Sequence, residues 1–231
     1  MPVERRHAFA LGPTEAISAK RDKSWLGEWK RRLLRRLRAA ISRTEMEEVL
    51  TSFRKGCVAE KSVRLGPNAW CVNLGARESI TLEANVICRG ILRLEGFRPA
   101  RLAIAEDVYI GDDTIISCAE HIEIGRLTMI AHGVQIFDND SHPVDPVLRE
   151  KDYLTLLGRL PGPRPAAASA PVIIGERAWI GMHSKVMKGV RIGADSVIAA
   201  GSVVTHDIPA ASIAAGVPAR VVSSIPAGPP E

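Results

Sequence analysis

The sequence predicts an all-β fold, a three-sided parallel β-helix preceded by α-helices. The main observation is a spacing of six residues between aliphatic side chains along much of the 231-residue chain. A second is the aromatic content of only 4%, which suits a narrow interior filled by small and β-branched side chains. A third is a basic pattern of helical period that is confined to the region before the repeat.

The region before the repeat is expected to contain a flexible leader, residues 1–19, and a basic amphipathic helical segment, residues 20–55. Residues 20–43 hold ten Lys or Arg and two acidic residues, so the net charge of +5 originates there. Thr44-Glu45-Met46-Glu47 fits a capping box, which predicts that a second, short helix begins there. The first helix has an apolar stripe of Leu26, Trp29, Leu33, Leu37 and Ile41.

Two interpretations of the basic helix stay open. Residues 24–41 can lie on an anionic membrane surface, or the apolar stripe can pack on the domain or on a sister subunit. Nucleic acid is not expected as a partner, because no binding motif accompanies the charge. The chain shows neither a membrane-spanning stretch nor a cleavable apolar leader, so we expect a cytoplasmic protein, peripheral at the inner face of the membrane if the helix binds lipid.

Residues 56–222 are expected to form the β-helix domain, followed by a flexible tail, residues 223–231. A six-residue unit with one aliphatic and one small inward residue is a short strand and a corner, and three units close one triangular coil. Glycines are expected at corners that leave no room for a side chain. The helices and the tail should cover the open strand edges at the two ends. The regular aliphatic positions are Ile104, Ile110, Ile116, Ile122, Ile124, Ile130, Ile136, Ile174, Ile180, Val186, Ile192, Ile198 and Val204.

The repeat is interrupted after Ile136, and residues 143–171 form an inserted loop that contains six prolines. Loops of this length inside a regular domain are commonly functional lids. We therefore expect the loop to act as a lid with a mobile Ala/Pro part. The residue at the break itself is His142, followed by Pro143.

Five short motifs accompany the repeat: Ile110-Gly111-Asp112-Asp113-Thr114, Asp140-Ser141-His142-Pro143, Val172-Ile173-Ile174-Gly175-Glu176-Arg177-Ala178-Trp179-Ile180-Gly181, Ile198-Ala199-Ala200-Gly201-Ser202-Val203-Val204-Thr205 and Ala215-Gly216-Val217-Pro218-Ala219-Arg220. Together they resemble the hexapeptide-repeat acyltransferases over roughly residues 100–222. The resemblance is to the sugar and polysaccharide O-acetyltransferase branch, with the maltose, galactoside and nodulation-factor enzymes. It implies a left-handed β-helix, a homotrimer, a saccharide acceptor, and acetyl-CoA as co-substrate in the groove between subunits.

The same resemblance implies that His142 is the general base. A neutral imidazole with a pKa of about 6.5 can take the proton of a hydroxyl as it attacks a thioester, so neither a covalent acyl-enzyme nor a metal is required. Asp138, Asn139 and Asp140 are near enough in sequence for one of them to orient the ring or the acceptor. Glu120 lies near the position where the family binds the acceptor, although the family's Asn and Asp have no clean counterpart.

The positions that match the family's CoA-binding residues include Arg220, whose guanidinium offers paired donors to phosphate oxygens. Met182 and His206 depart from the Ser and Lys that the family usually has at those positions. Trp179 either walls the site or is an outward aromatic of the repeat. The expected CoA-binding set is Trp179, Gly181, Met182, Ala200, Thr205, His206 and Arg220.

Two further functions are compatible with the same sequence pattern. N-acetylation of an amino or nucleotide sugar would use the same base, and a non-catalytic β-helix scaffold would need no histidine at the break. The four cysteines form no Cys-x-x-Cys pair, which favours reduced packing thiols over a zinc site. Cys118 remains as an alternative thiol nucleophile within the repeat.

Overall fold

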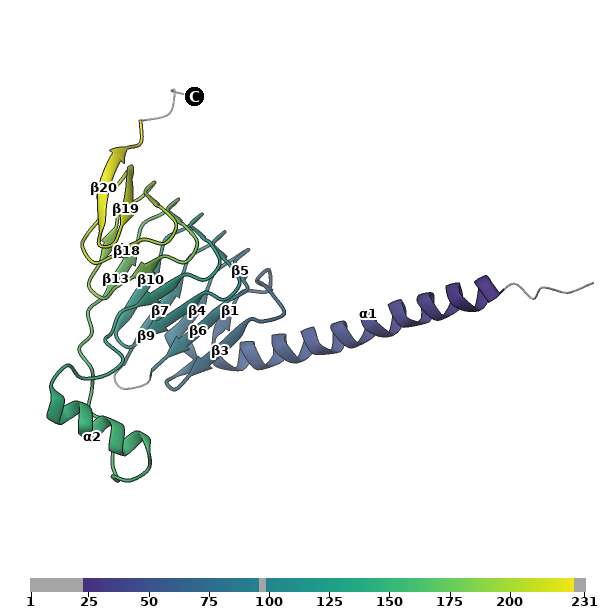
Figure 1. Ribbon diagram of the computed structural model, residues 1–231, viewed down its shortest axis with the longest axis horizontal. Helices are drawn as coiled ribbons and strands as arrows, with labels where there is room; N and C mark the ends of the chain where they lie inside the picture. Colours follow the sequence, from purple (N-terminus) through teal and green to yellow (C-terminus); the bar gives the residue numbers. More distant parts are fainter. Residues whose placement is uncertain (1–22, 96–98, 227–231) are drawn as a thin grey trace, which may run out of the picture. The chain divides into compact units, whose positions relative to one another are not determined.

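The computed structural model describes residues 23–95 and 99–226 (Figure 1). The chain divides into two units, residues 1–43 and residues 44–231. The predicted leader, residues 1–19, lies outside the described residues. The helices and strands are α1 (Lys23–Gly56), β1 (Val58–Ala59), β2 (Arg64–Leu65), β3 (Trp70–Asn73), η1 (Arg77–Ser79), β4 (Ile80–Leu82), β5 (Ile87–Cys88), β6 (Ile91–Leu94), β7 (Arg101–Ile104), β8 (Tyr109–Ile110), β9 (Ile115–Cys118), β10 (His121–Ile124), β11 (Met129–Ile130), β12 (Gln135–Phe137), α2 (Pro146–Leu156), β13 (Val172–Ile174), β14 (Trp179–Ile180), β15 (Lys185–Val186), β16 (Arg191–Ile192), β17 (Val197–Ile198), β18 (Val203–Val204), β19 (Ser212–Gly216) and β20 (Ala219–Ser224).

The N-terminal segment is one continuous helix, α1, and the prediction of two helices was wrong. Thr44 lies inside this helix, because no proline or glycine interrupts the chain between the basic segment and the predicted capping box. The basic first part exposes Leu33 and Leu34 to solvent. In the second unit the end of the helix buries Phe53 in the core of the β-helix.

The rest of the chain forms a three-sided parallel coil, which confirms the predicted left-handed β-helix. Every third strand joins the same sheet, so strands β4, β7 and β10 lie side by side (Figure 1). Strands β1 to β18 make six complete coils, and β19 begins a seventh. Sheet A is β1-β4-β7-β10-β13-β16, sheet B is β2-β5-β8-β11-β14-β17-β19-β20, and sheet C is β3-β6-β9-β12-β15-β18.

The aliphatic ladder fills the interior as predicted. On sheet B, for example, Ile110, Ile130, Ile180 and Ile198 are paired in register on successive strands and have no exposed surface. Each strand contributes only a few residues, so stacking of coils buries the apolar surface that no single coil could bury alone.

Glycines are needed where coils approach each other closely, and less often where the backbone turns. A Cβ atom added at Gly111 would lie 2.6 Å from the carbonyl carbon of Ala131 in the next coil. Most corner residues with left-handed backbone angles are not glycine. These residues are Asn85, Asp107, Asp113, Leu127, Arg177, His183 and Asp195, with φ between 55° and 61°.

The C-terminal end of the coil is covered by a hairpin, in which β20 pairs antiparallel with β19. Strand β20 extends to Ser224, so the predicted tail begins later than residue 223. Strand β20 thereby supplies hydrogen-bond partners for the backbone groups along the open edge of β19. Across residues 23–95 and 99–226, no helix combines the length and hydrophobicity that crossing a bilayer requires.

Candidate active site

The interruption of the repeat begins with a buried turn after strand β12. The carboxylate of Asp138 has no exposed surface and accepts hydrogen bonds from the backbone N–H groups of Ala119, Glu120 and His121, at 2.7 to 2.8 Å. Asn139 donates its side-chain amide to the same carboxylate, at 3.0 Å. These bonds fix the chain where it leaves the coil.

Ser141 and His142 follow in a tight turn. The backbone of Ser141 adopts a left-handed conformation, with φ of 63°, and its N–H donates to the side chain of Asn139 at 2.9 Å. The N–H of His142 donates to the carbonyl of Asp140 at 2.6 Å. The turn therefore projects His142 away from the coil, and its side chain is 49% exposed.

The inserted loop contains helix α2 between strands β12 and β13 (Figure 1), which the sequence reading did not predict. Asp145 caps the helix by accepting from the N–H of Leu148 at 2.9 Å, and Pro146 occupies its first turn. Gly158, with φ of 67°, follows its end. This order of Asp-Pro at the start and Gly after the end is a recognisable helix signature.

The returning part of the loop is anchored, so the expectation of a mobile Ala/Pro part was wrong at residues 168–170. The N–H of Asp140 donates to Ala168, and the N–H of Ala170 donates to Asp138, at 2.9 and 2.8 Å. The hydroxyl of Ser169 donates to the carboxylate of Glu120 at 2.7 Å. The backbone groups of Ala168 and Ala170, unlike those of the neighbouring prolines, include an N–H, and their hydrogen bonds close the loop onto the turn after β12.

Helix α2 supplies the partner of the candidate base. The Nδ1 atom of His142 lies 2.6 Å from Oδ2 of Asp152, whose side chain is only 1% exposed. Arg164 donates to both carboxylate oxygens of Asp152, through Nε at 2.6 Å and a terminal nitrogen at 3.2 Å. One buried carboxylate thus joins an imidazole and a guanidinium that are far apart in the sequence.

This arrangement has electrostatic consequences. Arg164, and after it His142, holds the pKa of Asp152 below its ordinary value, although burial acts in the opposite direction. When the imidazole of His142 is neutral, its Nδ1–H can donate to the ionised Asp152, and Nε2 is then the unprotonated nitrogen. Sequence reasoning missed Asp152 and Arg164 because each depends on the path of the loop.

The four residues expected near the acceptor are engaged within the protein. Asp138 and Asn139 are buried and hold the turn, and neither orients the His142 ring, a role that Asp152 fills. Asp140 is 2.6 Å from the ammonium group of Lys188, and Glu120 holds Ser169. The partner of the His142 ring is thus Asp152 and none of residues 138–140, and a role of these residues in orienting the acceptor stays a prediction.

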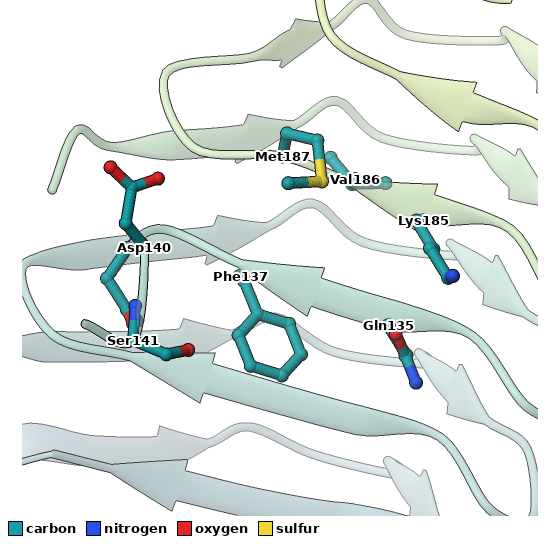
Figure 2. Close-up of a pocket in the computed structure, with 8 residues that line it drawn as sticks. Gln135, Phe137, Asp140, Ser141, Lys185, Val186 and Met187 are labelled. Atoms are coloured by element: carbon teal, nitrogen blue, oxygen red, sulfur yellow. The ribbon is translucent and has the colours of Figure 1, made fainter. Parts of the chain in front are cut away.

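Two hollows flank the segment from Asp140 to His142. The sheet hollow, of about 250 Å³, is lined by Gln135, Phe137, Asn139, Asp140, Ser141, Lys185, Val186 and Met187. Figure 2 shows Phe137 at its centre, with Gln135 and Lys185 toward one end and Asp140 and Ser141 toward the other. The helix hollow, of about 410 Å³, is lined by His142, Pro146, Arg149, Glu150 and Tyr153.

Part of the expected CoA-binding set gathers on the corner between sheets B and C. Gly181 and Met182 lie one coil before Ala200, since the N–H of Gly201 donates to Met182 at 2.8 Å. Trp179, on β14, is about half exposed.

The other expected CoA-binding residues lie on different elements. Thr205 and His206 follow β18, one coil beyond Met187 of the sheet hollow, and their side chains are 2.9 Å apart. Arg220 lies on β20, opposite Ala215 of β19. The structure thus spreads the set along two coils and the C-terminal hairpin.

The alternative nucleophile Cys118 does not fit the chemistry. Its side chain has no exposed surface, and burial raises the pKa of the thiol well above its ordinary value. Its sulfur donates to the carbonyl of Arg101 at 3.3 Å. Within residues 23–95 and 99–226, no group of three or more His, Cys, Asp or Glu is arranged to hold a metal ion.

Residues 171–206 match the family described as bacterial transferase hexapeptide (six repeats). The chain is 34% identical over 131 residues to the putative lipopolysaccharide biosynthesis O-acetyl transferase WbbJ of Escherichia coli strain K12, covering 57% of this chain and 64% of that protein. It is also 34% identical over 141 residues to the galactoside O-acetyltransferase of the same strain, covering 53% and 63%.

The fold is similar to that of AntD, an N-acyltransferase from Bacillus cereus. A variant of AntD matches 78% of this chain and 90% of its own, with a TM-score of 0.59 and 21% identity. These findings confirm the resemblance to the hexapeptide-repeat acyltransferases that was drawn from the motifs. It spans less than two thirds of the length of the two E. coli relatives.

Proposed function

We propose that this protein is an acetyl-CoA-dependent O-acetyltransferase that modifies a hydroxyl of a sugar or of a polysaccharide precursor. The observation that carries the proposal is the half-exposed ring of His142, whose Nδ1 atom is held by the buried carboxylate of Asp152. A histidine held in this way has one nitrogen fixed and the other free to accept a proton. The names of the E. coli relatives support the O-acetyl transfer.

In the proposed reaction, Nε2 of His142 accepts the proton of the acceptor hydroxyl while its oxygen attacks the carbonyl carbon of acetyl-CoA. The tetrahedral intermediate collapses as the carbon–sulfur bond breaks, and the leaving thiolate takes the proton from His142. Asp152 stabilises the imidazolium that exists between these steps, as a carboxylate does at a paired histidine. The products are the acetyl ester and free CoA.

The expected CoA-binding residues remain a proposal. Trp179, Gly181, Met182, Ala200, Thr205, His206 and Arg220 would contact the cofactor, with the guanidinium of Arg220 at a phosphate group. Lys185 and Met187 of the sheet hollow lie next to this track, because the N–H of Met187 donates to Val204 at 3.0 Å, one residue before Thr205. The crystal structure of AntD contains CoA, which supports a CoA site on this fold.

A homotrimer is the assembly we propose, with the loop of one subunit covering the groove of its neighbour. Several apolar side chains of the loop are exposed in the single chain, as expected of a surface that contacts another subunit. These side chains are Val144, Val147, Leu148, Leu156 and Leu157. We further propose that the protein is cytoplasmic and that residues 24–41 bring it to the anionic inner face of the membrane, because Lys30, Arg32, Arg35 and Arg36 are exposed there with Leu33 and Leu34.

The test is acetyl-CoA turnover by the purified protein with a panel of sugars, amino sugars and nucleotide sugars. Release of the CoA thiol measures the rate, and mass spectrometry with alkaline hydrolysis identifies an acetyl ester. The proposal predicts an alkali-labile ester on a saccharide hydroxyl. Formation of an alkali-stable amide alone would show that the protein is an N-acetyltransferase, and CoA-independent saccharide binding without turnover would favour a scaffold.

A further inference from the structure

We infer that one face of helix α2 forms the acceptor subsite, where Tyr153 and Glu150 recognise the ring and hydroxyls of an uncharged sugar beside His142. The inference rests on the proposed acetyl transfer and adds the class of acceptor and the residues that select it. It draws on the direction of the free histidine nitrogen, the spacing of residues on α2 and the unpaired carboxylate of Glu150.

The first step concerns the side from which the acceptor arrives. Asp152 occupies Nδ1 of His142, so the acceptor hydroxyl must reach Nε2. Of the two hollows, the helix hollow is the one that His142 lines. Its volume of about 410 Å³ lies in the usual range of small-molecule sites. The sheet hollow, which adjoins the expected CoA-binding residues, would then hold the thioester end of acetyl-CoA.

The second step concerns the helix. Pro146, Arg149, Glu150 and Tyr153 are spaced by three, one and three residues, so they share one face of α2. That face lines the helix hollow together with His142. Asp152 extends from the same helix to Nδ1 of the ring. One helix therefore orients the base and presents a surface to whatever the base deprotonates.

The third step concerns the chemistry of that surface. The side chain of Tyr153 is among the large exposed hydrophobic groups, at 57%. An exposed tyrosine offers an aromatic face for the apolar side of a sugar ring and a hydroxyl for its rim. The side chain of Glu150 forms no hydrogen bond or ion pair with the described residues, so both carboxylate oxygens can accept from neighbouring sugar hydroxyls.

The charge of the hollow favours an uncharged acceptor. Arg149 is held by the backbone, since it donates to the carbonyl of Val144 at 2.6 Å and lies 3.5 Å from that of Pro143. Its guanidinium therefore has fewer free donors for a ligand carboxylate. The carboxylate of Glu150, which has no side-chain partner within residues 23–95 and 99–226, would repel a uronate at the same place. The hydroxyls of a neutral hexose can hydrogen-bond to both Arg149 and Glu150 without charge repulsion.

The experiment compares Glu150→Gln and Tyr153→Ala with two matched controls on the opposite face of α2, Lys151→Gln and Thr155→Ala. The probes are methyl β-D-galactoside, maltose and methyl β-D-glucuronide, each assayed with acetyl-CoA. We expect Glu150→Gln to raise KM for the neutral sugars by about tenfold or more, the loss expected for a hydrogen bond to a charged group. Tyr153→Ala should raise it several-fold. The KM for acetyl-CoA should stay within twofold in all four variants, and the controls should behave as wild type.

Several results would overturn the inference. Unchanged KM for the neutral sugars in both variants, equal effects in the controls, or a preference of the wild type for the glucuronide would each do so. Saturation-transfer NMR with the same sugars measures binding without turnover, so it tests the subsite even if the preparation is inactive. Neutral sugars that fail to bind the wild type, or that bind Glu150→Gln equally well, contradict the subsite directly. Absence of acetyl transfer with every probe, despite sugar binding that Glu150→Gln weakens, would contradict the proposed function and leave the subsite standing.

Discussion

The imidazole of His142 acts through the groups that hold it. Its Nδ1 atom is bonded to Asp152, which is in turn bonded through both oxygens to Arg164. The carboxylate is buried and the imidazole is half exposed, so the pair is anchored on one side and open to substrate on the other. Burial of the carboxylate is tolerated here because both of its oxygens accept hydrogen bonds and Arg164 supplies a compensating charge.

Replacing the carboxylate by its amide tests this role. Asp152→Asn keeps the shape of the side chain but loses the charge that stabilises the imidazolium, so kcat should fall by one to several orders of magnitude, as at other paired histidines. The matched control is Asp112→Asn, which removes the carboxylate of a surface ion pair with Arg89. A steady-state assay in which both variants turn over acetyl-CoA at the wild-type rate would show that Asp152 does not position the base.

The lowered pKa of Asp152 gives a prediction about the stability of the loop at low pH. A carboxyl group whose pKa is lower in the folded than in the unfolded state contributes stability above its unfolded pKa, about 3.9, and loses it as the pH falls through the folded value. The loop should therefore stay closed at pH 5 and open only below about pH 4. Arg164→Met removes the largest cause of the shift and should move opening to higher pH.

Hydrogen exchange of the Asp140 and Ala170 amides, which pair across the loop closure, measures that opening. Identical pH profiles for the wild type and for Arg164→Met would contradict the assignment of the ion pair. Arg89→Met, at a distant exposed pair, serves as the control.

At the scale of elements, helix α2 organises the site. Its N-cap Asp145 and the N1 Pro146 start the helix where the chain leaves the turn, and Asp152 lies about two turns after the N-cap. The helix could have been predicted from Asp145-Pro146 and Gly158, which are ordinary start and stop signals. The contact between Asp152 and His142 could not, because it depends on how the loop folds back through residues 164–170.

Loss of the cap should weaken the helix and thereby the site. Asp145→Ala removes the acceptor of the Leu148 N–H and should cost about 1 kcal/mol of local stability. Asp145→Asn and Asp145→Ser retain a capping oxygen and should restore most of the activity. Limited proteolysis within the loop, together with kcat, measures both effects. Equal proteolysis of all three variants and the wild type would argue that the cap does not hold the helix.

At the scale of the whole β-helix, the six-residue spacing was enough to predict the three-sided coil. A large and a small inward residue in each unit leave few alternatives to a narrow triangular coil, and the strand pairings of sheets A, B and C follow from it. Before Ile104 the spacing is irregular, so the β-helix was predicted from residue 56 without the positions of its first ladder residues, such as Cys88 and Leu92. The single helix α1 was not predicted, because the capping-box pattern at Thr44–Glu47 indicated a new helix start. No helix-breaking residue immediately precedes Thr44, so the helix continues through it.

The ladder also predicts how stability is distributed. Ile130 has no exposed surface and lies between Ile110 and Ile180, so Ile130→Ala should lower the free energy of unfolding by about 2 to 5 kcal/mol and Ile130→Val by about 1 kcal/mol. The neighbouring Met129 faces outward, and Met129→Ala should stay within about 0.5 kcal/mol of wild type. Urea unfolding measures the difference, and equal losses at the two positions would contradict an inward ladder.

The central claim, that His142 is the base of an acetyl transfer, is tested most directly by His142→Ala with turnover and CoA binding measured on the same preparation. We predict that kcat falls by about a hundredfold or more while the Kd for CoA, measured by calorimetry, stays within about twofold, because a general base contributes to the reaction and little to cofactor binding. His142→Ala protein that binds CoA normally and transfers acetyl groups at the wild-type rate would contradict the account.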